Sequence, residues 1–246
     1  MSRGREVHDL FAQRAGSDYI ATTYALEGLD RALRRRAPRT VLEVGPGIGT
    51  TTSLVIRTLD ELHGPGSYEL CGIEHVEFCL QQMELNLGSE VSKTTVVSRY
   101  EELPEDVGPF EFVLVDGGGE GEADGSLPAE HVRQQNRLYV SRLAERAVVF
   151  VENKRPDQRA IFEAELDRPW SYVHVRPWND APGYHLYQLE PGLRDRLHAA
   201  LRRVADRWWY DTGCARWTNR QVRRVARRLG RRGASGGPGD VDRSTL

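Results

Sequence analysis

The chain has 246 residues, of which 34 are Lys or Arg and 36 are Asp or Glu, so its formal charge at pH 7 is −2. A chain of this length can bury the core of one α/β domain with short additions. Its nearly balanced charge excludes a protein that attracts polyanions over its whole surface. No apolar run is long enough to span a bilayer and no signal-peptide pattern is present, so we expect a cytoplasmic protein.

The first 39 residues predict an N-terminal helical cap made of two helices, over residues 6–15 and 18–36. Apolar side chains mark one side of the second helix, and Pro38 ends it.

From residue 40 to residue 190, segments with the pattern of strands alternate with segments typical of helices. Such alternation predicts parallel strands joined by right-handed crossovers. Two later strands, over 170–176 and 184–189, are separated by a Pro- and Gly-containing turn and predict a hairpin. The predicted fold class is therefore α/β: a Rossmann-like, seven-stranded, mostly parallel sheet with a closing antiparallel hairpin. Before the hairpin we expect strands at 40–44, 68–73, 94–98, 110–115 and 146–151, and helices at 50–62, 77–87, 128–144 and 157–166.

The C-terminal part is rich in arginine. Residues 194–232 contain thirteen Arg and three Asp, a net charge of +10, so the remainder of the chain is acidic. Residues 191–232 predict amphipathic helices, the first of them over 193–209, and residues 233–246 have the composition of a disordered tail.

Three cysteines, Cys71, Cys79 and Cys214, form no C-x-x-C pair. Cys71 falls in a predicted core strand. We expect reduced packing residues rather than disulfides or zinc ligands.

The segment 41–50, Val-Leu-Glu-Val-Gly-Pro-Gly-Ile-Gly-Thr, runs from an apolar strand through three glycines into a helix. Glycine permits positive φ and removes the Cβ that would obstruct a ligand, while the following helix N-terminus presents amide donors. A dinucleotide fingerprint would place its third glycine at position 50, where this chain has threonine. Glu43 can order the loop or reach the cationic end of a ligand, which S-adenosylmethionine (SAM) has and the NAD pyrophosphate lacks. The alternative is a turn with no ligand.

A second strand ends in an acid, Glu74, and a helix follows it. A carboxylate at this spacing can accept both ribose hydroxyls of a bound nucleoside. With Gly45, Gly47, Gly49 and Glu74 together, residues 40–190 resemble the class I SAM-dependent methyltransferases. The resemblance implies SAM as cofactor.

Two further strand ends narrow the resemblance. Asp116 follows the strand 110–115, and Glu152-Asn153 follows the strand 146–151. This arrangement resembles the catechol and caffeoyl-CoA O-methyltransferases, in which an Asp and an Asp-Asn pair bind a divalent metal. The resemblance implies Mg²⁺ at Asp116, Glu152 and Asn153, with Asp116 also close to cofactor and substrate. Glu152 replaces the family's Asp, so the alternative is that Asp116 closes a turn and that Glu152 and Asn153 only shape the pocket.

Four other residues are candidates for roles in the site. Lys154 adjoins the implied metal triad, and His131 begins a predicted helix; either can act as a general base, or be a solvated surface residue. Tyr100 can flank the adenine and Glu101 can accept from its amino group, whereas many relatives have an acid at position 99. The alternative for Tyr100 and Glu101 is a surface loop.

The sequence thus favours an enzyme that moves a methyl group from SAM to an oxygen, or less readily a nitrogen, of a small molecule. A second hypothesis is methylation of RNA or another macromolecule, with the arginine-rich helices contacting phosphates. A third is a binding protein that keeps the fold without catalysis. The oligomeric state stays open, a homodimer included.

Overall fold

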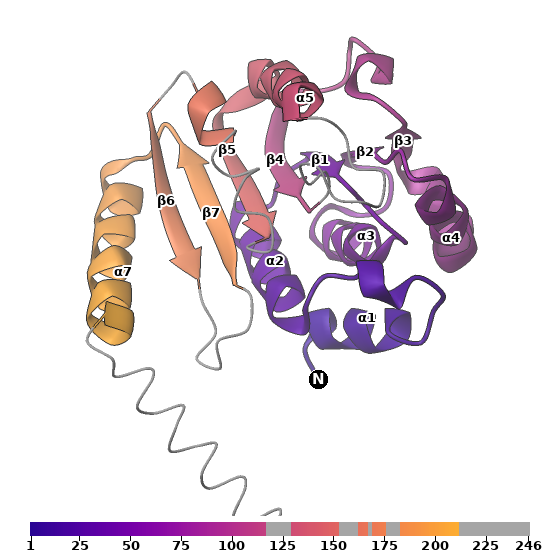
Figure 1. Ribbon diagram of the computed structural model, residues 1–246, viewed down its shortest axis with the longest axis horizontal. Coiled ribbons are helices and arrows are strands. Elements are labelled where there is room, and N and C mark those ends of the chain that lie inside the picture. Colours follow the sequence, from indigo (N-terminus) through magenta and orange to yellow (C-terminus); the bar gives the residue numbers. More distant parts are fainter. Residues whose placement is uncertain (117–128, 153–161, 167–168, 176–182, 212–246) are drawn as a thin grey trace, which may run out of the picture. The chain divides into compact units, whose positions relative to one another are not determined.

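The computed structural model describes residues 1–116, 129–152, 162–166, 169–175 and 183–211. It contains a seven-stranded sheet of order β3-β2-β1-β4-β5-β7-β6 (Figure 1). The chain divides into two compact units, Met1–Ala200 and Leu201–Leu246, and the sheet belongs to the first. The strands are β1 (Thr40–Val44), β2 (Glu69–Ile73), β3 (Thr95–Val97), β4 (Phe110–Val115), β5 (Leu143–Glu152), β6 (Trp170–Val175) and β7 (Tyr184–Leu189).

The pairing of these strands confirms the predicted fold class. Strands β1 to β5 pair in parallel with their neighbours, whereas β7 pairs antiparallel with both β5 and β6. Parallel strands need crossover connections, which the helices supply, and the short connection between β6 and β7 allows an antiparallel hairpin. The helices are α1 (Arg3–Phe11), α2 (Thr23–Arg36), α3 (Thr50–His63), α4 (Glu77–Leu87), α5 (Ala129–Ser141) and α7 (Leu193–Asp211), with 3₁₀ turns at Ser17–Tyr19, Gly88–Lys93 and Tyr100–Glu102.

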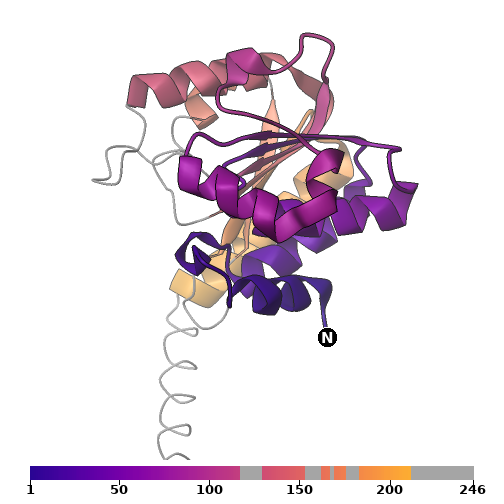
Figure 2. The ribbon, with the colours of Figure 1, turned by 90° about the vertical axis from the view of Figure 1, so that its right-hand side faces the viewer.

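Each face of the sheet carries its own hydrophobic core. Val41 and Phe112 face the core that α1, α2, α3 and α4 cover, whereas their neighbours Leu42 and Val113 face the core beneath α5 (Figure 2). Successive side chains of a strand point to opposite faces, so a strand covered on both sides is apolar throughout. This explains the continuous apolar runs of β4 and β5.

The N-terminal helices differ from their predicted bounds because of their caps. The helix predicted over 6–15 begins at Arg3, where the Ser2 hydroxyl accepts a hydrogen bond from the Arg5 N–H (3.4 Å). The helix predicted over 18–36 is interrupted: a 3₁₀ turn covers Ser17–Tyr19, and α2 begins after Thr22, whose hydroxyl accepts from the Ala25 N–H (3.2 Å). Hydroxyl caps satisfy backbone donors that a longer helix would otherwise satisfy itself.

Other predictions fall partly outside the described residues. The helix predicted over 157–166 is seen only in the helical residues 162–165, and the helix predicted over 128–144 is shorter, because α5 ends before β5 begins at Leu143. Cys71 and Cys79 are buried free thiols, as expected, whereas Cys214 lies outside the described part. Residues 212–246 also lie outside it. None of the described helices is long and apolar enough to cross a membrane.

Helix α2 lies against β7 because it has a glycine at the contact. A Cβ built on Gly28 would lie 2.2 Å from Cε1 and 2.4 Å from Cζ of Tyr184. Tyr184 is 4% exposed and stacks on Phe150, with ring centroids 4.7 Å apart. The glycine therefore lets α2 approach the closing hairpin.

We predict that Gly28→Ala lowers the free energy of unfolding by about 1–3 kcal/mol, the usual cost of overpacking a core. Urea unfolding measures this. In a Tyr184→Ala background the same change should be neutral or stabilising, since alanine favours a helix over glycine by up to ~1 kcal/mol. Equal destabilisation in both backgrounds would contradict the contact.

Candidate functional site

The glycine segment after β1 is a preformed loop. Gly45, Gly47 and Gly49 have φ of 81°, 58° and 91°, in the left-handed region that favours glycine. A Cβ on Gly49 would lie 2.9 Å from Cγ of Met83, so α4 packs directly on the loop. The Asn86 side-chain amide of α4 donates to the Ile48 carbonyl (3.0 Å). These contacts within the protein fix the shape of the loop.

Glu74, at the end of β2, is bound to this loop. Its Oε2 accepts a hydrogen bond from the Gly47 N–H (2.9 Å), and its Oε1 accepts from the N–H groups of His75 and Val76 (2.9 Å each). The residue is 5% exposed. An ionised carboxylate has about four acceptor positions, so three donors leave capacity for a ribose hydroxyl.

Glu43 lies beneath the loop and is fully buried. Its carboxylate accepts hydrogen bonds from the hydroxyls of Thr51 and Thr52, the latter at 2.7 Å, in the first turn of α3. Both oxygens of Glu43 therefore have partners in the first turn of α3, the helix into which the loop leads. Burial raises the pKa of Glu43 to about 7; the two hydroxyl hydrogen bonds oppose this rise and the charge of Glu74 adds to it.

Asp116 and Glu152 follow the paired ends of β4 and β5, where Val115 lies beside Val151. Asp116 is half-buried, and its N–H donates to the Val44 carbonyl (3.0 Å), next to the glycine loop. Glu152 is 2% exposed and accepts from the N–H of Thr22, the cap residue of α2, at 3.5 Å. The two carboxylates therefore lie at the same edge of the sheet as the glycine loop.

The structure does not describe the side chains of the other residues predicted as metal ligands or bases. Asn153 and Lys154 lie outside the described residues, and His131 is in α5, where only its backbone is described. In the part of the chain that is described, no three His, Cys, Asp or Glu side chains are grouped closely enough to hold a metal ion.

Tyr100 and Glu101 differ in what they can offer a ligand. Tyr100 is 4% exposed in the core beneath α5, with the Arg142 guanidinium 5.7 Å from its ring centroid, and burial raises the pKa of its hydroxyl. Its ring already packs against protein. Glu101 is exposed in the turn Tyr100–Glu102. Of the two, Glu101 has the side chain available to an adenine amino group.

Solved structures share this fold. The O-methyltransferase TomG of Streptomyces achromogenes, involved in tomaymycin synthesis and crystallised with SAM, is 17% identical, with 77% of this chain and 88% of that chain covered and a TM-score of 0.54. A Staphylococcus aureus protein described as a caffeoyl-CoA O-methyltransferase is 13% identical (77% and 93% covered, TM-score 0.54). A Clostridium thermocellum protein described as an rRNA methylase is 12% identical (69% and 99% covered, TM-score 0.54). No family model and no curated protein matches the sequence.

The chain has the fold of the class I SAM-dependent methyltransferases. The resemblance inferred from the glycine loop and Glu74 is confirmed at the level of the fold.

In this methyltransferase fold the N-terminal segment 16–22 reaches the glycine loop, which sequence reasoning missed. A Cβ on Gly16 (φ 84°) would lie 2.7 Å from Ile48 Cγ2 and 2.8 Å from Phe78 Cε1. A Cβ on Gly47 would lie 3.1 Å from the Tyr19 carbonyl oxygen. The sequence predicts residues 18–22 as the start of a helix that is joined to the preceding helix at Gly16-Ser17. Glycine readily adopts positive φ and so marks a break between helices, but it does not indicate the contact with the loop.

We predict that Glu43 makes stability depend on pH. Its folded-state pKa, about 7, lies above the ordinary value of 4.5, so the folded state binds the proton more tightly. The stabilisation is complete below pH 4.5 and is lost as pH rises through 7, by at most about 3 kcal/mol.

Glu43→Gln should flatten this part of the stability profile, because the amide stays neutral and can still pair with the threonine hydroxyls. Urea unfolding across this pH range measures the profile, and Glu101→Gln, at an exposed glutamate, is the control. An unchanged slope in Glu43→Gln would refute the assignment.

Proposed function

We propose that this protein is a SAM-dependent methyltransferase that moves a methyl group to an oxygen of a small molecule. The observation that carries the proposal is the hydrogen bond from the Gly47 N–H of the glycine loop to the Glu74 carboxylate, at the edge where class I folds bind ligands. The remaining acceptor capacity of Glu74 suits a ribose hydroxyl of SAM.

The edge of the sheet also suits a sulfonium donor. Glu74, Asp116 and Glu152 are carboxyl groups at the ends of three strands, and Glu43 lies one residue before the end of a fourth. A positively charged ligand is favoured where several carboxylates gather. The NAD pyrophosphate, which is negative, would be disfavoured at the same place.

The proposed reaction is an in-line displacement. A lone pair of the acceptor oxygen forms the new bond to the methyl carbon, and the electrons of the breaking carbon–sulfur bond return to the sulfur, which becomes a neutral thioether. The hydroxyl proton leaves to a base, for which Lys154, His131 and Asp116 are our candidates. Of these three side chains, only that of Asp116 belongs to the described part of the chain. It is half-buried and lies beside the glycine loop. The fold contributes chiefly by holding the two reactants in line.

A divalent cation is part of the proposal through Asp116, Glu152 and Asn153. Carboxylate and amide oxygens are ligands that Mg²⁺ accepts. Asp116 and Glu152 lie at neighbouring strand ends, which fits such a site, although one Glu152 oxygen faces the Thr22 N–H. When bound, the cation would ease deprotonation of a substrate hydroxyl.

RNA is the second candidate acceptor. The thirteen arginines of residues 194–232 favour it, because basic segments neutralise phosphates. Against it, Asp116 is followed by three glycines rather than the Pro-Pro-aromatic element usual in enzymes that methylate amino groups of nucleic acids. A binding protein without turnover would bind SAM and transfer nothing.

We predict that Gly47→Val abolishes SAM binding in calorimetry. Gly47 has positive φ, its Cβ would lie 3.1 Å from the Tyr19 carbonyl, and its N–H binds Glu74. Gly66→Val is the matched control, since Gly66 also has positive φ (73°) but no atom within 4 Å of an added Cβ. Micromolar binding retained by Gly47→Val would refute the loop as the cofactor site.

A transfer assay with tritiated SAM tests the reaction and the acceptor together. We expect label to enter small hydroxylated molecules and not RNA, and EDTA treatment to abolish transfer until Mg²⁺ is restored. Label in RNA would favour RNA over a small molecule as the acceptor. Full turnover after rigorous metal removal would eliminate the cation and leave Glu152 as a residue that anchors α2.

A further inference from the structure

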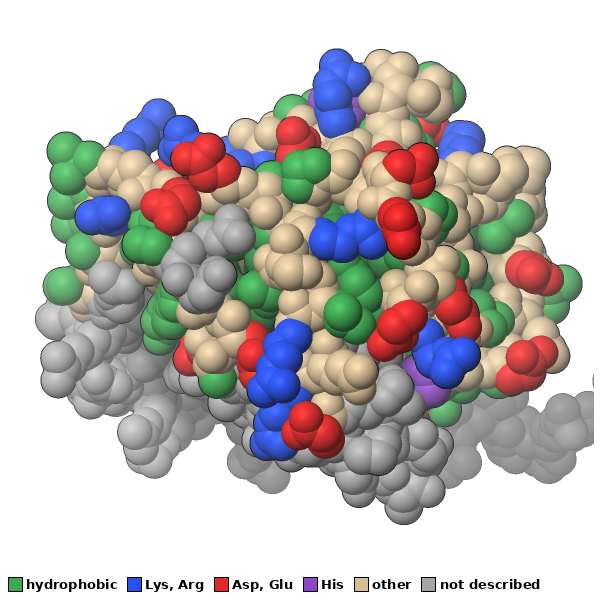
Figure 3. Space-filling view, turned by 90° about the horizontal axis from the view of Figure 1, so that it is seen from above, with side chains coloured by type: hydrophobic (Ala, Val, Ile, Leu, Met, Phe, Trp, Pro, Cys, Tyr) green, Lys and Arg blue, Asp and Glu red, His purple; other side chains and the backbone are tan. Residues whose placement is uncertain are grey.

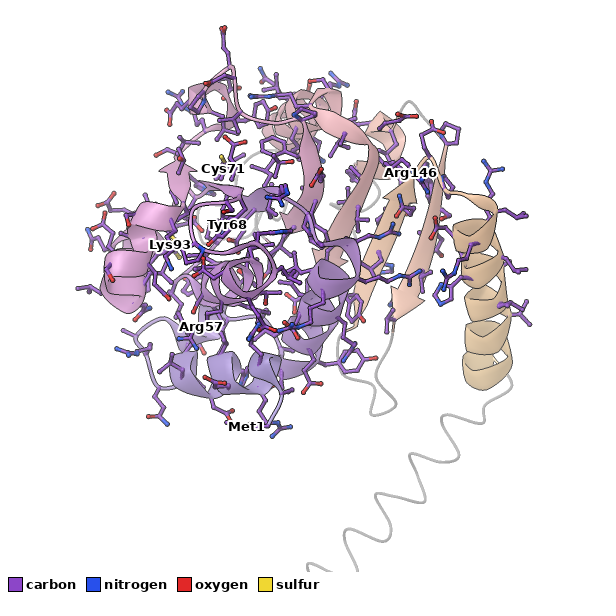
Figure 4. The ribbon with its side chains drawn as sticks, turned by 180° about the vertical axis from the view of Figure 1, so that it is seen from behind. Met1, Arg57, Tyr68, Cys71, Lys93 and Arg146 are labelled. Atoms are coloured by element: carbon purple, nitrogen blue, oxygen red, sulfur yellow. The ribbon has the colours of Figure 1, made fainter. Side chains whose placement is uncertain are left out.

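Three arginine side chains surround one carboxylate at the end of the sheet opposite the glycine loop. Arg35 and Arg36 end α2 just before β1 begins, Arg146 lies near the start of β5, and Asp195 lies in the first turn of α7. The nearest guanidinium nitrogens of Arg35, Arg36 and Arg146 are 3.9, 3.6 and 3.8 Å from the Asp195 oxygens. Figure 4 labels Arg146, on the strand end near which α7 starts.

These ion pairs are long, and the guanidinium groups keep unused donors. Within the described part of the chain, the side chains of Arg35, Arg36 and Arg146 make no hydrogen bond and no ion pair other than these contacts with Asp195. Each guanidinium carries five N–H donors. Water can satisfy the exposed ones, but a ligand with several acceptor oxygens can replace that water.

The cluster, which we call the Asp195 cluster (Arg35, Arg36, Arg146 and Asp195), carries two positive charges in excess. Burial lowers the pKa of Arg36, Asp195 opposes this, and the charges of Arg35 and Arg146 lower it further. Like charges are thus close enough to disfavour one another, a cost that a bound anion would remove. The space-filling view of this end shows basic and acidic side chains together where β7 leads into α7 (Figure 3).

The start of α7 adds to the positive potential. The Arg196 N–H donates to the Gly192 carbonyl (3.0 Å), which marks the first hydrogen bond of the helix. The amides of the first turn before it have no helical partner, and the helix N-terminus has partial positive charge. Asp195, in this first turn, occupies the position where a negative group is favoured.

We propose that the Asp195 cluster is a binding site for a phosphate group, separate from the proposed SAM crevice. Guanidinium groups match phosphate oxygens in geometry and charge, and a phosphate can accept from several at once. The source of the phosphate is either a small phosphate compound or the backbone of RNA.

Two variants and a matched control test the site in the full-length protein, with inorganic phosphate and a short single-stranded RNA as probes. The first variant, Arg146→Ala, removes a guanidinium of the cluster whose side chain is 62% exposed. The control, Arg99→Ala, removes an arginine that is 66% exposed and is paired with Glu102, outside the cluster. Asp195→Asn removes the competing negative charge. Binding is measured by calorimetry for phosphate and by fluorescence anisotropy for RNA, and thermal unfolding checks each variant.

We expect Arg146→Ala to weaken binding of at least one probe fivefold or more, and Arg99→Ala to leave it unchanged. Asp195→Asn should strengthen the same binding about three- to tenfold at low salt, because a nearby negative charge is removed. The proposal is overturned if neither probe binds, if Arg146→Ala behaves like Arg99→Ala, or if Asp195→Asn weakens binding. A response to RNA alone assigns the site to nucleic acid, and a response to phosphate assigns it to small phosphates.

Discussion

The hydrogen bond from the Gly47 N–H to the Glu74 carboxylate is the contact on which the site depends. It joins the end of β2 to the loop after β1, and the same carboxylate accepts two further N–H groups before α4. A carboxylate that is 5% exposed needs such donors, since a buried charge without partners is costly. Glycine at position 47 is what lets the loop present its N–H to Glu74, because φ there is 58°. The loop is therefore shaped before any ligand arrives.

Charged side chains gather at both ends of the sheet, and the parallel topology decides which residues meet there. Parallel strands place all their carboxyl ends at one edge, so the acids that follow or end β2, β4 and β5 lie at the same edge as the glycine loop. At the opposite edge the end of α2, the start of β5 and the start of α7 bring three arginines to one aspartate. Our two proposals place a cationic cofactor at the first edge and a phosphate at the second. At each edge, side chains from elements that are far apart in the sequence lie close together.

The parts of the site that could be predicted are those that depend on local sequence. The glycines, the strand end at Glu74 and the strand bounds of β1 and β4 follow from residue type and hydrophobic pattern. The partners of Glu43 could not be predicted, because the helix that supplies Thr51 and Thr52 must first fold over the strand. Nor could the burial of Tyr100, which depends on α5 and Arg142, or the contact of the 16–22 segment with Gly47.

The sequence by itself determined the α/β class, the parallel order with a closing hairpin, and the identity of the loop and acid that define the proposed cofactor site. These features can be recognised in the sequence without knowledge of packing. The signals are the alternating pattern of strands, the helical pattern, the spacing of the glycines and the carboxyl groups at strand ends. The tertiary structure alone decided which side chains meet: Thr22 with Glu152, Gly28 with Tyr184, and Arg36 and Arg146 with Asp195. Such contacts join residues many positions apart, and their geometry depends on how helices cross the sheet, which one sequence does not specify.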